Sequence, residues 1–136
     1  MKKIAAILLI LPIILLCSFS FHRTKQAYIM LSSGTISPMT AERNERYFSP
    51  GQRIYYVILS PDGFKYQGVR MQLSKQDDKT SNWGFSIIQS RDFVIDMAQN
   101  QYNDHLTVSR PGRYILQFFY LNNKDYPFAH TEFMVQ

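Results

Sequence analysis

Residues that commonly build metal centres are scarce in this sequence. Its 136 residues include one cysteine, Cys17, so no disulfide can form within the chain. The three histidines lie far apart in the sequence, at His22, His105 and His130. Because a zinc site needs several thiolate or imidazole ligands close together, and because no Asp-x-Asp-x-Asp ladder for calcium is present, we expect no bound metal.

Motifs for common catalytic chemistry are also absent. The chain has no Gly-x-Ser-x-Gly, His-Glu-x-x-His or glycine-rich phosphate loop. Its only glutamates are Glu42, Glu45 and Glu132, and the spacing of the first two indicates surface charge rather than a glycosidase pair. Asp104 precedes His105, a local acid and base pair that is typical of a solvated loop edge. The sequence therefore predicts no enzyme, no catalytic residues and no cofactor.

Charge of either sign is modest. The chain carries 15 lysines and arginines against 10 aspartates and glutamates. Apart from Lys2 and Lys3, the basic residues are spread singly from Arg23 to Lys124, commonly beside an acid. A surface that binds nucleic acid instead gathers its lysines and arginines on one face, so we expect no nucleic-acid partner.

The longest apolar run lies near the N-terminus and has the form of a secretory signal. Met1-Lys2-Lys3 precedes an uncharged, mostly aliphatic run over Ile4–Leu16. Ser18-Phe19-Ser20 places small side chains where a signal peptidase reads them, so we expect cleavage after Ser20, with residues 1–20 removed and Phe21 as the first mature residue. If the run continues to Phe21 it is about long enough to cross roughly 30 Å of hydrocarbon, so a retained anchor helix is the alternative.

Cys17 provides a third outcome for this segment. A cysteine just after an apolar run resembles the acylated cysteine of bacterial lipoproteins, although the bulky Leu16 precedes it where that family has a small residue. The resemblance implies a lipid on Cys17; otherwise Cys17 is an apolar residue of the signal segment. In all cases we expect an extracytoplasmic protein, in the periplasm, on the outer surface or secreted. It would meet a membrane only through its N-terminal segment or a lipid on Cys17.

The rest of the chain is predicted to form one all-β domain. Residues 21–26 are mostly polar and basic and are interpreted as a tether, which leaves 27–136 for the domain. Short apolar runs alternate there with turn residues, as in an antiparallel sandwich or barrel. Residues 53–59 are dense in Ile, Tyr and Val, which predicts a central strand, and Ser60-Pro61-Asp62-Gly63 predicts the turn after it.

The other expected strands follow from alternation of apolar and polar residues. Val69, Met71 and Leu73 alternate with polar residues, which is typical of a strand with one buried face. Further strands are expected at 83–89, 92–97, 106–108, 113–121 and 128–135, with 113–121 the longest and 98–104 a polar loop. In the last strand we expect four side chains to face inward: Ala129, Thr131, Phe133 and Val135.

The C-terminal part resembles an immunoglobulin-like domain. Pro111-Gly112-Arg113-Tyr114-Ile115-Leu116, a loop and a strand ending Phe133-Met134-Val135 are similar to the last two strands of that family. The resemblance implies a single Ig-like antiparallel β-sandwich of seven or eight strands, with Tyr114 as a tyrosine corner bonded to upstream backbone. The family's cysteine pair is missing, and Leu116 stands at the place of the second cysteine. Such an architecture implies no activity.

Aromatic residues supply the candidate ligand-binding residues. The chain has nine tyrosines, ten phenylalanines and one tryptophan, and rings at the rim of a sandwich can stack on sugars or anchor a protein. Our candidates are Trp83, Tyr102 and Tyr126. We expect an exported binding or structural module of the cell envelope or secreted fraction that recognises a protein or glycan through edge strands and rim loops. A carbohydrate-binding module using these three rings, and a small hydrolase or inhibitor, are the alternatives.

Overall fold

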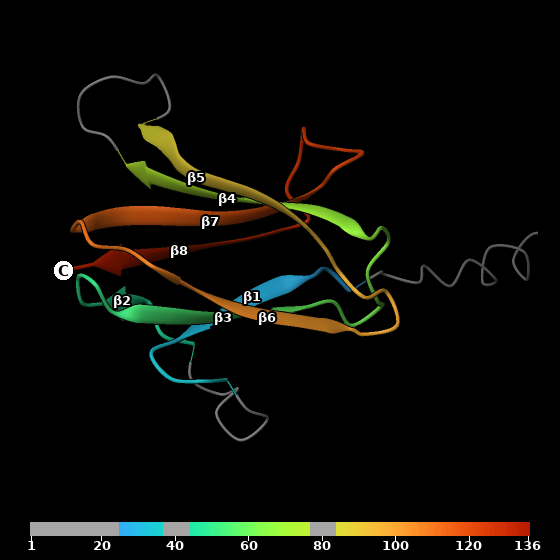
Figure 1. Ribbon diagram of the computed structural model, residues 1–136, viewed down its shortest axis with the longest axis horizontal. Coiled ribbons are helices and arrows are strands. Elements are labelled where there is room, and N and C mark those ends of the chain that lie inside the picture. The colour runs from blue at the N-terminus through green and yellow to red at the C-terminus, as the bar shows by residue number, and fades with distance from the viewer. Residues whose placement is uncertain (1–24, 37–43, 77–83) are drawn as a thin grey trace, which may run out of the picture.

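The computed structural model describes residues 25–36, 44–76 and 84–136. In these ranges the chain forms eight strands: β1 (Tyr28–Ser32), β2 (Tyr47–Phe48), β3 (Arg53–Leu59), β4 (Gly68–Gln76), β5 (Phe85–Val94), β6 (Gln101–Thr107), β7 (Gly112–Tyr120) and β8 (Ala129–Val135). They build a three-stranded sheet in the order β1-β3-β6 and a five-stranded sheet in the order β2-β8-β7-β4-β5. Figure 1 shows the two sheets as stacked layers. The predicted all-β sandwich of two sheets is confirmed. The expectation that it is antiparallel throughout is wrong, because β2 pairs with β8 in parallel.

Alternation of apolar residues explains how each sheet contributes to the core. The strand predicted over 53–59 is β3, the middle strand of its sheet, between β1 and β6. Ile54, Tyr56 and Ile58 of β3 are buried, and Val69, Met71 and Leu73 of β4 are buried against them from the other sheet. In β8 the four residues expected to face inward are all buried: Ala129, Thr131, Phe133 and Val135.

Tyr114 connects the core to the turn that precedes β7. Its fully buried ring stacks on Phe133 of β8, with centroids 5.4 Å apart. Its hydroxyl donates a hydrogen bond to the Arg110 carbonyl at 2.5 Å. Burial raises the pKa of the Tyr114 phenol. The ring therefore fixes the turn while it fills the core, as the neutral phenol that this burial favours.

The structure differs from the sequence prediction between residues 83 and 107. Two strands were expected, at 83–89 and 92–97, with a loop over 98–104, whereas β5 is continuous over 85–94 and β6 begins at Gln101. At ten residues, β5 is also longer than the strand predicted at 113–121, which corresponds to the nine-residue β7. The physical reason is that β5 and β6 are edge strands, so many of their side chains are exposed to solvent. Polar residues in the middle of such a strand resemble the sequence of a turn.

Candidate functional site

The residues predicted for the site fall in different parts of the chain. Four of them lie outside the described residues: Cys17, Ser20, Phe21 and Trp83. Tyr126 lies on the loop between β7 and β8 and is 78% exposed. Tyr102 lies in β6 and is half-buried. In the described ranges, no helix is long and apolar enough to cross a membrane.

Tyr102 packs inside the fold rather than at its rim. Its ring stacks on Phe93 of β5 at 4.7 Å between centroids, and it also contacts Tyr56 at 6.5 Å. Burial, followed by the negative charge of Asp104, raises the pKa of Tyr102. No ring contact joins Tyr102 to Tyr126 in the part of the chain that is described. The structure therefore does not bring these two rings together as one stacking surface.

The free edge of β5 is the feature best placed to bind a partner. β5 is the last strand of its sheet and pairs only with β4. It exposes three apolar side chains: Ile87 is 60% exposed, Ile88 52% and Val94 72%. Sequence reasoning missed this edge because it divided β5 in two; the isoleucine pair followed by polar residues was the available signal.

The main-chain groups of β5 that face away from β4 follow from the hydrogen bonding. The amide of Ile95 donates to the Gln67 carbonyl at 2.9 Å, so these opposite residues form a hydrogen-bonded pair. In an antiparallel ladder such pairs alternate with pairs that exchange no hydrogen bonds, and the register continues along this half of β5. The N–H and C=O groups of Ser90, Asp92 and Val94 therefore point away from β4, toward the open edge.

A β-bulge opens a cavity beside the other half of this edge. Gln89 opposes Leu73 and Ile87 opposes Ser74, so Ile88 is the extra residue of the bulge. The cavity has a volume of about 240 Å³. It is lined by Leu73, Lys75, Ile88, Gln89, Thr107, Val108, Ser109, Arg110 and Tyr114. It thus lies between the edge of the five-stranded sheet and the connection from β6 to β7.

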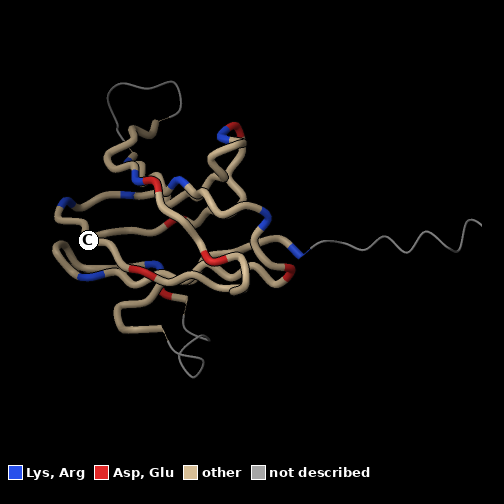
Figure 2. Tube along the Cα trace, turned by 45° about the vertical axis from the view of Figure 1, so that its right-hand side comes forward, with Lys and Arg blue, Asp and Glu red and all other residues tan. Residues whose placement is uncertain are grey.

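The cavity carries positive charge at its rim. Lys75 of β4 and Arg110 before β7 both line it, and within the described ranges neither forms an ion pair. Figure 2 shows lysine and arginine positions around this end of the sandwich, where the C-terminus also lies. The site therefore combines apolar walls with two cations that form no ion pair with an acid of the described residues.

The side chain of Arg91 links the second half of β5 to the other sheet. It opposes the buried Met71 across the ladder, so its side chain leaves β5 on the core side. Its Nη2 donates to Asp104 Oδ2 of β6 at 2.6 Å and to the Tyr56 hydroxyl at 3.4 Å. The guanidinium also lies 5.5 Å from the centroid of the Phe93 ring. These contacts run toward the other sheet, whereas the outward main-chain groups of Ser90 and Asp92 point away from β4, toward the open edge.

The pKa shifts of this cluster have separate causes. Burial is the main reason that the pKa of Tyr56 is raised, and the negative charge of Asp104 adds to it. For Asp104, partial burial favours the neutral acid, but the hydrogen bonds from Arg91 and the His105 amide outweigh it and the pKa is lowered. At neutral pH the cluster thus holds an ionised Asp104 paired with Arg91 beside a neutral Tyr56.

His105, the base of the hydrolase alternative, lies beside the same carboxylate. Its Nδ1 is 3.4 Å from Asp104 Oδ1, and both residues line a cavity of about 260 Å³ with Tyr55 and Tyr56. The other Asp104 oxygen is held by Arg91 and lies within 3.4 Å of the Tyr102 hydroxyl. This carboxylate is therefore engaged mainly in joining β5 to β6.

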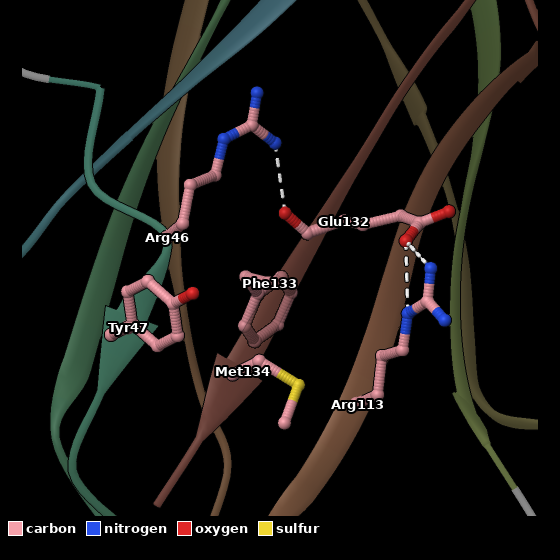
Figure 3. Close-up of a pocket in the computed structure, with 6 residues that line it drawn as sticks. All are labelled: Arg46, Tyr47, Arg113, Glu132, Phe133 and Met134. Carbon is pink, nitrogen blue, oxygen red and sulfur yellow. Dashed lines mark hydrogen bonds and ion pairs between the residues drawn. The ribbon is translucent and has the colours of Figure 1, made fainter.

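A further cavity, of about 290 Å³, lies on the outer face of the five-stranded sheet (Figure 3). Arg46 donates to the Glu132 carbonyl at 2.8 Å and to the Thr131 hydroxyl. Arg113 pairs with the Glu132 carboxylate, its Nε donating at 3.0 Å. Tyr47 stands beside them, 66% exposed. Because both guanidiniums already bind the protein, these contacts mainly fasten β2 and β7 to β8.

Metal ligands do not gather in the described part of the molecule: no three His, Cys, Asp or Glu side chains there come together as a metal site would require. Every buried side-chain nitrogen or oxygen of the described residues has a hydrogen-bond partner. Within the described ranges, neither a metal cluster nor an unpartnered buried polar side chain therefore marks a ligand site.

Comparison with known proteins finds similarity in fold only. No protein-family model and no curated protein matches the sequence. The fold is similar to the soluble domain of PmoD from Methylocystis sp. ATCC 49242 (Rockwell), at 11% identity and a TM-score of 0.48 over 81% of this chain and 90% of that chain. It is also similar to part of a β-glucosidase from Kluyveromyces marxianus, solved in complex with glucose, at 13% identity and a TM-score of 0.40. That match covers 84% of this chain and 14% of the glucosidase.

Proposed function

We propose that this protein is an exported, non-enzymatic binding module that accepts an extended segment of a partner protein as an added strand on β5. The observation that carries the proposal is the outward direction of the main-chain groups of Ser90, Asp92 and Val94. Unpaired N–H and C=O groups at a sheet edge bind an added strand by main-chain hydrogen bonds, without any special side chain.

The other sheet edges are less suited to this role. β2 has two residues. The edge of β1 is already occupied, because the Glu45 amide donates to the Leu31 carbonyl at 2.9 Å and the Asn44 side chain accepts from the Leu31 amide at 3.1 Å. β6 has seven residues and exposes no large apolar side chain. β5 combines the greatest length with exposed apolar side chains.

The remaining parts of the proposal come from the sequence. The tyrosine-corner hydrogen bond at Tyr114 and the two-sheet sandwich support an Ig-like architecture. The basic and apolar segment over 1–20 supports export from the cytoplasm, with cleavage, a retained anchor or a lipid on Cys17 as its outcomes. The partner would then be a protein of the envelope or of the surrounding medium.

The test is photo-crosslinking of the full chain in the native envelope. A photoreactive amino acid placed at Ile87 or Ser90 should crosslink a partner, and the same amino acid at the exposed Tyr47 is the matched control. The crosslinked partner peptide is identified by mass spectrometry and synthesised, and amide exchange is measured with and without it. Protection of the Ser90 and Asp92 amides on binding is the expected result.

The variant Ser90→Pro provides the decisive comparison. Proline at this position removes an outward N–H and leaves the β4 ladder intact, which edge strands tolerate. Binding of the synthetic peptide should fall by about tenfold or more, since a main-chain hydrogen bond is lost and the partner carbonyl is left unpaired. Equal crosslinking at Tyr47 and β5, or undiminished binding by a folded Ser90→Pro protein, would contradict strand addition.

Glycan binding is the second candidate, and the exposure of Tyr126 favours it. Tyr126 at 78% and Tyr66 at 49% exposure leave ring faces open to solvent, as sugar stacking requires. On a glycan array, the full chain should then bind a defined sugar and lose that binding in Tyr126→Ala and Trp83→Ala. Tyr28→Ala, at 49% exposure, is the control. If Tyr126→Ala and Trp83→Ala bind the sugar as well as the Tyr28→Ala control does, the stacking proposal is excluded.

A further inference from the structure

The cavity beside β5 has the size of a side-chain pocket. Its volume of about 240 Å³ lies below the roughly 300–1,000 Å³ typical of small-molecule sites. Leu73, Val108 and Tyr114 line it and are themselves buried, so an apolar group entering it would meet apolar walls. Ile88 of the bulge supplies a further apolar wall next to the open edge.

Local structure holds Lys75 at this cavity. Gly112 has a φ of 147°, a conformation that side-chain-bearing residues rarely adopt. A Cβ atom built on Gly112 would lie 2.7 Å from Lys75 Cε, so the missing side chain makes room for the lysine to cross the turn. Arg110 lies two residues earlier, and its carbonyl is held by Tyr114 at 2.5 Å. The positions of both cations at the cavity are therefore fixed by local structure: Lys75 lies over Gly112, and the Arg110 backbone is held by Tyr114.

Strand direction decides which part of a partner reaches these cations. A strand added antiparallel to β5 runs from the Val94 end toward the Phe85 end. At that end Phe85 opposes Gln76 and Ser86 opposes Lys75. The C-terminal end of the added strand therefore lies at the same end of the sheet as the cavity. A last residue that turns past Ile88 into this cavity would place its carboxylate near both cations, where it would form charge-assisted hydrogen bonds.

From these observations we propose that the cavity recognises the free C-terminus of the partner strand, with the last apolar side chain between Ile88 and Tyr114 and the terminal carboxylate between Lys75 and Arg110. This inference rests on the proposed strand addition to β5 and specifies its partner. The occupant is a protein that ends in an extended segment with a large aliphatic or aromatic last residue. Its negative chain end complements two cations that pair with no acid of the described ranges.

The experiment uses an array of random hexapeptides that end in Leu, Ile, Val or Phe, each present as the free acid and as the C-terminal amide. A third copy of each peptide continues for two further residues, Gly-Ser. Binding of the labelled full chain is measured on all three. Free acids should bind at least about tenfold more tightly than the amides and the extended copies, the factor that corresponds to 1.4 kcal/mol.

Variants then assign the preference to the two cations. Arg110→Gln and Lys75→Gln should each remove most of the advantage of the acid over the amide while they leave amide binding unchanged. Arg53→Gln is the matched control, since Arg53 is an exposed cation at the same end of the sandwich that does not line the cavity. Its acid preference should stay within about twofold of the unsubstituted chain.

The outcomes separate this inference from the proposed function. If acids, amides and extended copies bind equally, and Ser90→Pro weakens all of them, the C-terminal preference is wrong and strand addition stands. If peptides bind but Ser90→Pro has no effect on any of them, strand addition is wrong, and the inference that rests on it is wrong too. Absence of binding by every free acid also overturns the C-terminal preference, because the array includes each class of last residue it requires.

Discussion

Arg91 and Asp104 join the edges of the two sheets, with Arg91 Nη2 2.6 Å from Asp104 Oδ2. Arg91 comes from β5, the last strand of the five-stranded sheet, and Asp104 from β6, the last strand of the other. Phe93 and Tyr102 stack beside them at 4.7 Å. These contacts join the two sheets through side chains on the core side of β5, whereas the main-chain groups of Ser90, Asp92 and Val94 point away from β4 toward the open edge.

A double-mutant cycle should detect the coupling between Arg91 and Asp104. Their side chains are 45% and 25% exposed, so solvent screens the pair and the coupling should be about 1 kcal/mol, the upper end for exposed ion pairs. The cycle consists of Arg91→Gln, Asp104→Asn and the double variant, compared by urea unfolding. The control cycle is Arg113 and Glu132, exposed at 47% and 45%, which should give less. Additive effects of Arg91→Gln and Asp104→Asn would show that this ion pair does not link the two sheets energetically.

Acid should weaken the fold through Asp104. Its pKa is lowered in the folded protein, because the hydrogen bonds from Arg91 and the His105 amide outweigh the opposing effect of burial. The unfolded chain, with a pKa of about 3.9, therefore binds a proton more readily. The stabilisation is present above roughly pH 4 and is lost as the pH falls through the folded pKa.

Unfolding measured as a function of pH checks this sign. Asp104→Asn should be less stable than the unsubstituted chain near pH 7, and the difference should narrow as the pH approaches about 3. The pKa of Asp92 is lowered as well, through its hydrogen bond with Arg70, so part of the acid sensitivity should persist in Asp104→Asn. A stability difference that is constant with pH would show that Asp104 is not the titrating group.

The sequence predicted those strands that have one buried face and one exposed face. In β8 the period of two is complete, and in β4 it holds from Gly68 to Leu73, after which Ser74 is buried as well. The strand predicted over 53–59 has the same bounds as β3. Its bounds could be predicted because a central strand is apolar over most of its length, while the turns on either side are polar. In these cases the burial that stabilises the strand is also the pattern that reveals it.

The candidate site was not predictable in the same way. A free edge acts through main-chain groups, which every residue carries, and β5 exposes nearly all its side chains, so no alternation marks it. The partner of Arg91 is Asp104 of the other sheet, a pairing that requires the tertiary fold. Tyr102 looked like a ligand-binding ring because its neighbours are polar, but its partner Phe93 lies nine residues earlier, in β5.

The mass of the mature protein shows how the N-terminal segment is processed. Expressed in a bacterial host, the chain should be recovered from the envelope or medium with a mass that begins at Phe21, because Ser18-Phe19-Ser20 fits signal peptidase. A mass that begins at an acylated Cys17 would indicate a lipoprotein, and a full-length mass in membranes an anchor. Full-length protein in the cytoplasm would contradict export. Replacement of Ser20 by a bulky residue should block cleavage.

Removal of the Tyr114 hydroxyl should loosen the turn that carries Arg110. Tyr114→Phe keeps the ring stacked on Phe133 but deletes the hydrogen bond to the Arg110 carbonyl. The free energy of unfolding should fall by about 1 kcal/mol, the usual net contribution of one hydrogen bond. Tyr47→Phe, at a side chain that is 66% exposed, is the control, and its free energy of unfolding should be nearly unchanged.

If Arg110 is a carboxylate ligand, Tyr114→Phe should also weaken the binding of free-acid peptides more than the binding of their amides. A fully stable Tyr114→Phe protein would show that the hydroxyl bond does not support the turn.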